Sequence, residues 1–148
     1  MTAKILNGKK IAQEILEEVS VEVTALKNSG WDPKLLSIQI GENPAVDLYI
    51  RNQRKKAEQA GISFEEKDFP GDISVEELQA AISNFNVDPK VTGIILQRPV
   101  PESIPIKNLQ KAIHPLKDVE GMHPTSIGNI VYNELELGPC TAMASVEL

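Results

Sequence analysis

At 148 residues and with 41% hydrophobic content, the chain is long enough for one well-buried core and too short for two comfortable ones. Its net charge of -6, from 21 acidic and 15 basic residues without a block of like charge, gives it little electrostatic reason to bind nucleic acid. The single cysteine excludes a disulfide framework and fits a cytoplasmic protein. We expect neither a signal peptide nor a membrane span, because no apolar run is long enough.

The first part of the chain alternates helical and strand patterns. A long amphipathic helix is predicted from Lys9, with apolar residues at three- and four-residue spacing up to a stop at Asn28-Ser29-Gly30. The run Leu35–Ile40 is typical of a strand. Asn43 can then cap a second helix, which starts with a proline and continues to about Ala60 before a glycine closes it.

The same alternation continues to the middle of the chain. Ile62–Phe69 predicts a second strand, and Ser74–Phe85 predicts a helix that opens with a capping box formed by Ser74 and Glu77. Gly93–Leu96 is a short continuous apolar run, as expected of a strand that is buried on both faces. This order favours an α/β fold, a three-layer α-β-α domain with a mainly parallel sheet and right-handed crossovers.

The pattern is looser after Pro101. We expect a helix in Ile104–Ile113, a loop in Pro115–Pro124 and a short helix in Thr125–Tyr132. Pro139-Cys140-Thr141 predicts a turn into a further helix, Ala142–Leu148.

The end of the Gly93–Leu96 strand is the first candidate for ligand contact. Pro99 and Pro101 forbid further ladder pairing, so the strand must stop at Gln97. Ligands of open α/β sheets bind outside the carboxyl ends of the strands. Gln97 is therefore a candidate substrate-contacting residue.

Tyr49, Gln53 and Lys56 are a second candidate, because offsets of four and three residues place them on one face of the second helix. Composition alone favours a basic, solvated helix face with Tyr49 half buried. The functional interpretation is that Tyr49 provides an aromatic platform for a planar ligand.

A third candidate is the loop 117–124, where Asp118 and Glu120 are two residues apart. Their carboxylates can bind amino groups of a heterocycle or transfer protons, or they can be solvated turn residues. His114 and His123 lie nearby, but their spacing matches no zinc pattern, so we expect no metal. Cys140 starts a helix, where a thiolate would be stabilised, although a small packing residue is the commoner outcome.

Taken together, these segments resemble the amino-terminal catalytic domain of the bifunctional methylenetetrahydrofolate dehydrogenase/cyclohydrolase family. The resemblance covers nearly the whole chain. Its motifs follow in the family's order: Ile5-Leu6-Asn7-Gly8-Lys9, Gly41-Glu42-Asn43-Pro44-Ala45 with Tyr49, Gly93-Ile94-Ile95-Leu96-Gln97 with Pro99-Val100-Pro101, Lys117-Asp118-Val119 with Gly121 and His123-Pro124, and Pro139-Cys140-Thr141.

The resemblance implies a folate cleft in which Tyr49 stacks on the folate, Gln97 positions the catalytic group and Pro99 adds a substrate contact. The family's catalytic lysine, four residues after the tyrosine, is Gln53 here, and the family's pterin-binding aspartate is Glu120. A glutamine amide has no ionisable proton near neutral pH, so Gln53 should cripple hydrolysis of the methenyl bridge. Glu120 keeps the charge but needs room for one more methylene.

The resemblance also implies a larger architecture. Residues 1–138 would be the folate-binding catalytic domain, and residues 139–148 would start the helix that connects it to a dinucleotide-binding domain. The chain itself has neither a G-x-G-x-x-G motif nor a P-loop, so we expect it to bind no cofactor, whereas the complete protein would use NAD or NADP. The complete protein would be a homodimer and this segment a monomer. Two alternatives stay open, a catalytically inactive folate-like binding module and an oligomerisation domain.

Overall fold

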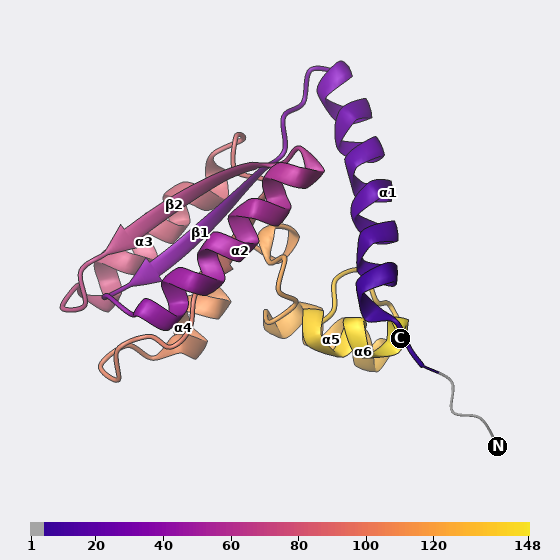
Figure 1. Cartoon of the computed structure of the whole chain (residues 1–148). Helices are drawn as coiled ribbons and strands as arrows, with labels where there is room; N and C mark the ends of the chain where they lie inside the picture. Colours follow the sequence, from indigo (N-terminus) through magenta and orange to yellow (C-terminus); the bar gives the residue numbers. More distant parts are fainter. Residues whose placement is uncertain (1–4) are drawn as a thin grey trace.

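The structure, a computed structural model, describes residues 5–148 and forms an α/β domain (Figure 1). A short 3-10 helix, Pro115–Lys117, lies between the fourth and fifth α-helices. The other elements, in chain order, are α1 (Gly8–Asn28), β1 (Lys34–Ile40), α2 (Pro44–Ala60), β2 (Ser63–Phe69), α3 (Val75–Val87), β3 (Gly93–Leu96), α4 (Ile106–Ala112), α5 (Pro124–Tyr132) and α6 (Cys140–Glu147).

The three strands form a parallel sheet in the order β2-β1-β3, which confirms the predicted fold class. β1 pairs with β2 along its full length, from Lys34 opposite Ser63 to Ile40 opposite Phe69. On its other side, β1 pairs with β3 over four residues. Beyond β3, Asp118 forms an isolated parallel bridge with Ile94, so the loop 117–124 lies beside the edge of the sheet.

Helices cover both faces of the sheet, as Figure 1 shows for α2 and α3. The main core lies on the α3 and α4 side, because alternate residues of β1 and β3 point that way. Fully or almost fully buried side chains from these four elements pack there: Leu36, Ile38, Ile40, Leu78, Ile82, Ile94, Leu96 and Leu109. The opposite face carries Ser37 and Gln39 of β1 together with Ile95 of β3 and is covered by α2.

The predicted helix boundaries are confirmed where a capping residue marks them. Asn43 accepts a hydrogen bond from the Ala45 N–H at 3.0 Å, and α2 ends at Gly61 in the left-handed conformation. At α3, Ser74 and Glu77 form the reciprocal capping box.

Three details after Pro101 differ from the prediction. α4 spans Ile106–Ala112, which is shorter than the predicted helix Ile104–Ile113. Pro115–Lys117 forms a 3-10 turn inside the predicted loop, because His114 Nδ1 accepts a hydrogen bond from the Leu116 N–H at 3.2 Å. α6 begins at Cys140 and not at Ala142, since its first turn already forms a bond from the Met143 N–H to the Pro139 carbonyl. Among residues 5–148, no helix combines the length and the apolarity that crossing a membrane requires.

Candidate functional site

Gln53 lies on the face of α2 that packs against the sheet. The buried residues of this helix are Val46, Ile50, Ala57 and Ala60, and Gln53 occupies the same stripe at three- and four-residue spacing. A polar side chain on this stripe has lost much of its water and needs a partner inside the protein.

The partner is Gln97, the first residue after β3. Gln97 Nε2 donates to Gln53 Oε1 at 2.7 Å and to Ser37 Oγ of β1 at 2.9 Å. Both Gln97 and Ser37 are buried, with exposed fractions of 4% and 1%. The backbone holds Gln97 in place as well, because its N–H donates to the Ile38 carbonyl at 2.9 Å. Side chains from α2, from β1 and from the first residue after β3 therefore meet at the carboxyl end of β3.

Glu120 reaches the same strand end from the loop 117–124. Its Oε2 accepts a hydrogen bond from the Leu96 N–H at 3.3 Å, one residue before Gln97. The alternative of solvated turn carboxylates is wrong for Asp118, which is 3% exposed and accepts bonds from the His123 N–H at 2.7 Å and from Ser126 Oγ at 3.1 Å. Asp118 thus fixes the loop from which Glu120 projects.

Lys117 anchors the other side of this loop. Its ammonium group donates to the Phe85 carbonyl at 2.9 Å and to the Asp88 carbonyl at 2.7 Å, at the end of α3. Burial lowers the pKa of Lys117, and the Asp88 carboxylate opposes that shift. The loop is held at both ends, so the position of Glu120 follows from the fold.

Burial raises the pKa of Glu120 above the ordinary range of a glutamate. The positive charge of Arg98 and the hydrogen bond from Leu96 oppose this shift, while the Asp118 charge adds to it. The carboxyl group is therefore easier to protonate than a solvent-exposed glutamate.

This raised pKa predicts a pH dependence of stability. Between the ordinary glutamate pKa, about 4.3, and the raised folded-state pKa, the folded chain binds the Glu120 proton more tightly than the unfolded chain does. The free energy of unfolding should therefore fall as the pH rises through that window. Urea unfolding at a series of pH values should show a shallower decline in Glu120→Gln than in the wild type. Glu102→Gln, at an exposed position, controls for the loss of charge, and an equal change in both variants would contradict the prediction.

Tyr49 and Pro99 lie around this polar cluster. Tyr49 is one helical turn before Gln53. The residue is 59% exposed, which is more exposed than the half-buried side chain expected from composition. Pro99 is also exposed, two residues after Gln97. Lys56 lies elsewhere. Its ammonium group donates to Gln59 at 3.1 Å, and the residue lines a groove together with residues of α1. Lys56 therefore does not share a face of α2 with Tyr49 and Gln53, although the spacing predicted that it would.

The remaining candidate residues, Cys140 and His123, have structural surroundings that differ from a reactive or metal-binding site. Cys140 is exposed, so its expected role as a small buried packing residue is wrong. Partial burial of its thiol together with the Glu120 charge raises its pKa, so the alternative of a stabilised thiolate is wrong as well. His123 Nδ1 accepts a bond from the Thr125 N–H at 3.0 Å and caps α5. Among residues 5–148, no three His, Cys, Asp or Glu side chains lie where they could hold one metal ion.

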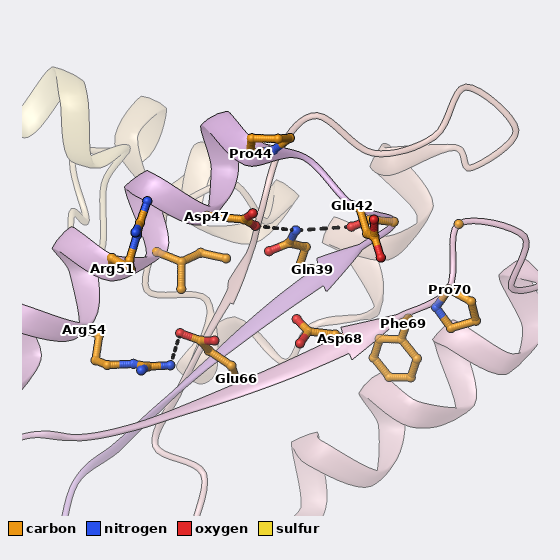
Figure 2. Close-up of a pocket in the computed structure, with 13 residues that line it drawn as sticks. Gln39, Glu42, Pro44, Asp47, Arg51, Arg54, Glu66, Asp68, Phe69 and Pro70 are labelled. Carbon is orange, nitrogen blue, oxygen red and sulfur yellow. Dashed lines mark hydrogen bonds and ion pairs between the residues drawn. The ribbon is translucent and has the colours of Figure 1, made fainter.

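A larger open groove, of about 1130 Å³, lies on the other flank of α2 (Figure 2). Asp47 and Arg51 of α2 and Glu66 and Asp68 of β2 are among the residues that line it (Figure 2). Gln39 donates to Asp47 at 3.1 Å inside the groove, and Arg54 pairs with Glu66 at its rim. Its lining includes none of the predicted site residues, so the groove is distinct from the cluster at the end of β3.

Ser37 is the member of the cluster that the sequence interpretation missed. The signal that could have found it is the alternation in Leu35–Ile40, where Ser37 and Gln39 are the polar residues of an otherwise apolar strand. Two polar side chains on one face of a central strand need partners above that face.

Comparison with known proteins gives consistent matches. Residues 6–120 match the family model for the catalytic domain of tetrahydrofolate dehydrogenase/cyclohydrolase. A relative from Mesorhizobium japonicum, the bifunctional protein FolD 2, is 59% identical over 146 residues, which are 99% of this chain and 48% of the relative. The chain spans about half the length of the curated relatives that it matches.

Solved structures give the same result. A methylenetetrahydrofolate dehydrogenase from the silkworm Bombyx mori superposes with a TM-score of 0.93 at 35% identity, over 99% of this chain and 51% of that one. A methylenetetrahydrofolate dehydrogenase-cyclohydrolase from Trypanosoma brucei, complexed with NADP and an inhibitor, has a TM-score of 0.90 at 28% identity, with the same coverage of both chains.

Proposed function

Because the chain belongs to the tetrahydrofolate dehydrogenase/cyclohydrolase family, we propose that it binds a folate at the carboxyl end of β3, as the catalytic half of a one-carbon enzyme. The observation that carries this proposal is the hydrogen bond between Gln53 and Gln97. It joins the two positions that the family resemblance implies for catalysis, although they are 44 residues apart in sequence.

The surrounding residues support a flat heterocyclic ligand. The exposed ring of Tyr49 can stack on the pteridine, with Pro99 as an apolar contact on the strand exit. The Glu120 carboxyl group can bind the aminopyrimidine edge, since a carboxylate accepts two parallel N–H bonds. Arg98, exposed beside Pro99, can attract the carboxylates of the folate tail.

We expect this cleft to support one of the family's two reactions, the oxidation, better than the other, the hydrolysis. In the longer protein, oxidation of 5,10-methylenetetrahydrofolate transfers a hydride to NAD or NADP and needs no proton transfer from residue 53. Hydrolysis of the methenyl bridge needs a general acid or base, which Gln53 cannot supply. We therefore propose a dehydrogenase whose cyclohydrolase step is impaired.

The proposal includes the larger architecture. Residues 1–138 would form the folate-binding domain, of which residues 1–4 lie outside the described part, and residues 139–148 would start the link to a dinucleotide-binding domain. Relatives of about twice the length and the NADP complex of the Trypanosoma brucei protein support this arrangement. The complete protein would be a cytoplasmic homodimer, and the present segment alone would be a monomer without bound cofactor.

The direct test is isothermal titration of the chain with 5-formyltetrahydrofolate, a stable folate analogue. We expect saturable binding that Tyr49→Ala weakens by about fivefold or more, since stacking of a ring on an aromatic side chain contributes about 1 to 3 kcal/mol in comparable sites. The matched control is Tyr132→Ala, which removes the other tyrosine, exposed on α5. Equal affinity of the two variants for the ligand would show that Tyr49 does not contact it. Absence of binding by the wild type at millimolar ligand would contradict folate binding by this chain.

A further inference from the structure

Ser37 holds the Gln97 amide from the sheet side of the cluster. It lies in the middle of β1, opposite Ile95 of β3, and is 1% exposed. A buried hydroxyl group costs free energy unless it forms a hydrogen bond. The bond from Gln97 Nε2 at 2.9 Å provides it.

The two hydrogen bonds of Gln97 use its full donor capacity. The Nε2 group has two hydrogens, and they go to Ser37 Oγ and to Gln53 Oε1. Within residues 5–148, neither Gln97 Oε1 nor Gln53 Nε2 has a hydrogen bond, and no buried side-chain nitrogen or oxygen lacks a partner. Neither of these two atoms is therefore fully buried. Gln97 Oε1 is a hydrogen-bond acceptor and Gln53 Nε2 is a donor.

We propose that Ser37 is a positioning residue of the cleft, whose hydroxyl fixes the Gln97 amide so that Gln97 Oε1 and Gln53 Nε2 face the ligand. The inference rests on the proposed function for the identity of that ligand. The resulting acceptor and donor pair is uncharged and is complementary to an amide-like edge of a pteridine. Without the hydroxyl, the Gln97 amide keeps only its bond to Gln53. Two amides can form that bond in the reverse direction as well, so part of the population presents the wrong groups.

Folate affinity in a double-mutant cycle tests this role. In titrations with 5-formyltetrahydrofolate, Ser37→Ala should weaken binding by about tenfold, the effect of one lost hydrogen bond. In a Gln97→Leu background, the same substitution should change the affinity by less than about twofold, because no amide is left to orient. An equal loss in both backgrounds, or no loss in either, would show that Ser37 only fills space in the strand.

A ligand-free measurement separates this inference from the proposed function. The side-chain NH₂ signals of Gln97 should exchange slowly with solvent in the wild type and faster in Ser37→Ala. Gln39 is an internal control, because its NH₂ group is held by the Gly41 carbonyl and by Asp47. If the wild type binds no folate, the proposed function fails, and these signals alone decide the role of Ser37. Unchanged exchange of the Gln97 signals would overturn it.

A second variant covers the case in which Ser37→Ala folds poorly. Ser37→Cys keeps a side chain of similar size with a weaker acceptor, so its effects on affinity and on Gln97 exchange should lie between those of the wild type and of alanine. Urea unfolding of each variant gives the folded fraction. Effects on affinity that follow the urea midpoint, and not the strength of the acceptor, would contradict the positioning role.

Discussion

Replacing Gly121 by alanine is expected to destabilise the domain by about 2 kcal/mol or more, from left-handed strain and overpacking together. Gly121 has a φ of +64°, in the left-handed region, and a Cβ atom there would lie 2.3 Å from the backbone carbon of Gly138. Backbone atoms cannot turn aside as a side chain can, so the loop that carries Glu120 or the segment before α6 must shift.

The matched control is Gly128→Ala, in the middle of α5, where an added Cβ meets nothing within 4 Å. Alanine in a helix interior is favoured over glycine by about 0.5 to 1 kcal/mol. Urea unfolding followed by circular dichroism should therefore show opposite shifts of the midpoint for the two variants. A midpoint that stays unchanged or rises in Gly121→Ala would contradict the close approach of the two backbone segments.

Gly121 also illustrates which parts of the fold could be predicted from the sequence. β3 was predicted with its observed boundaries, because a fully buried strand is a continuous apolar run and the prolines after it allow no extension. The start of α2 and the capping box of α3 depend on neighbours within three residues, and these too were predicted. The contact of Gly121 with Gly138 joins two loops, and no local pattern records it.

The candidate site was predicted only in part, for the same reason. Resemblance to the family pointed to Gln53, Gln97 and Glu120, and the structure gathers all three at the end of β3. The supporting side chains were missed or misjudged. The sequence pattern predicts Ser37 only as part of a strand and allows a solvated Asp118, because burial of a polar group depends on the tertiary structure. Lys56 shares a helical spacing with Gln53, yet α1 packs beside it and separates its environment from the cleft.

Gln53→Lys is expected to accelerate hydrolysis of 5,10-methenyltetrahydrofolate by about 100-fold or more, the contribution of a positioned general acid or base. This step uses no nicotinamide, so it can be measured on the present chain from the loss of the methenyl absorbance. The lysine would meet Gln97 Nε2, which is also a donor, unless the amide turns over. The ammonium charge of the lysine would favour that turn, and the Ser37 hydroxyl would then donate to Gln97 Oε1 instead of accepting from Nε2.

A control separates this effect from a general gain of charge on α2, and a second variant tests the other family position. Asn52→Lys adds the same ammonium group one residue earlier, at an exposed position, and should leave the rate unchanged. Adding Glu120→Asp to Gln53→Lys restores both family residues and should raise the rate further if the longer carboxyl side chain hinders the ligand. A cleft that binds folate but stays inactive with both substitutions would have been remodelled for binding alone, because a lysine at the end of β3 would then lack the geometry that proton transfer requires.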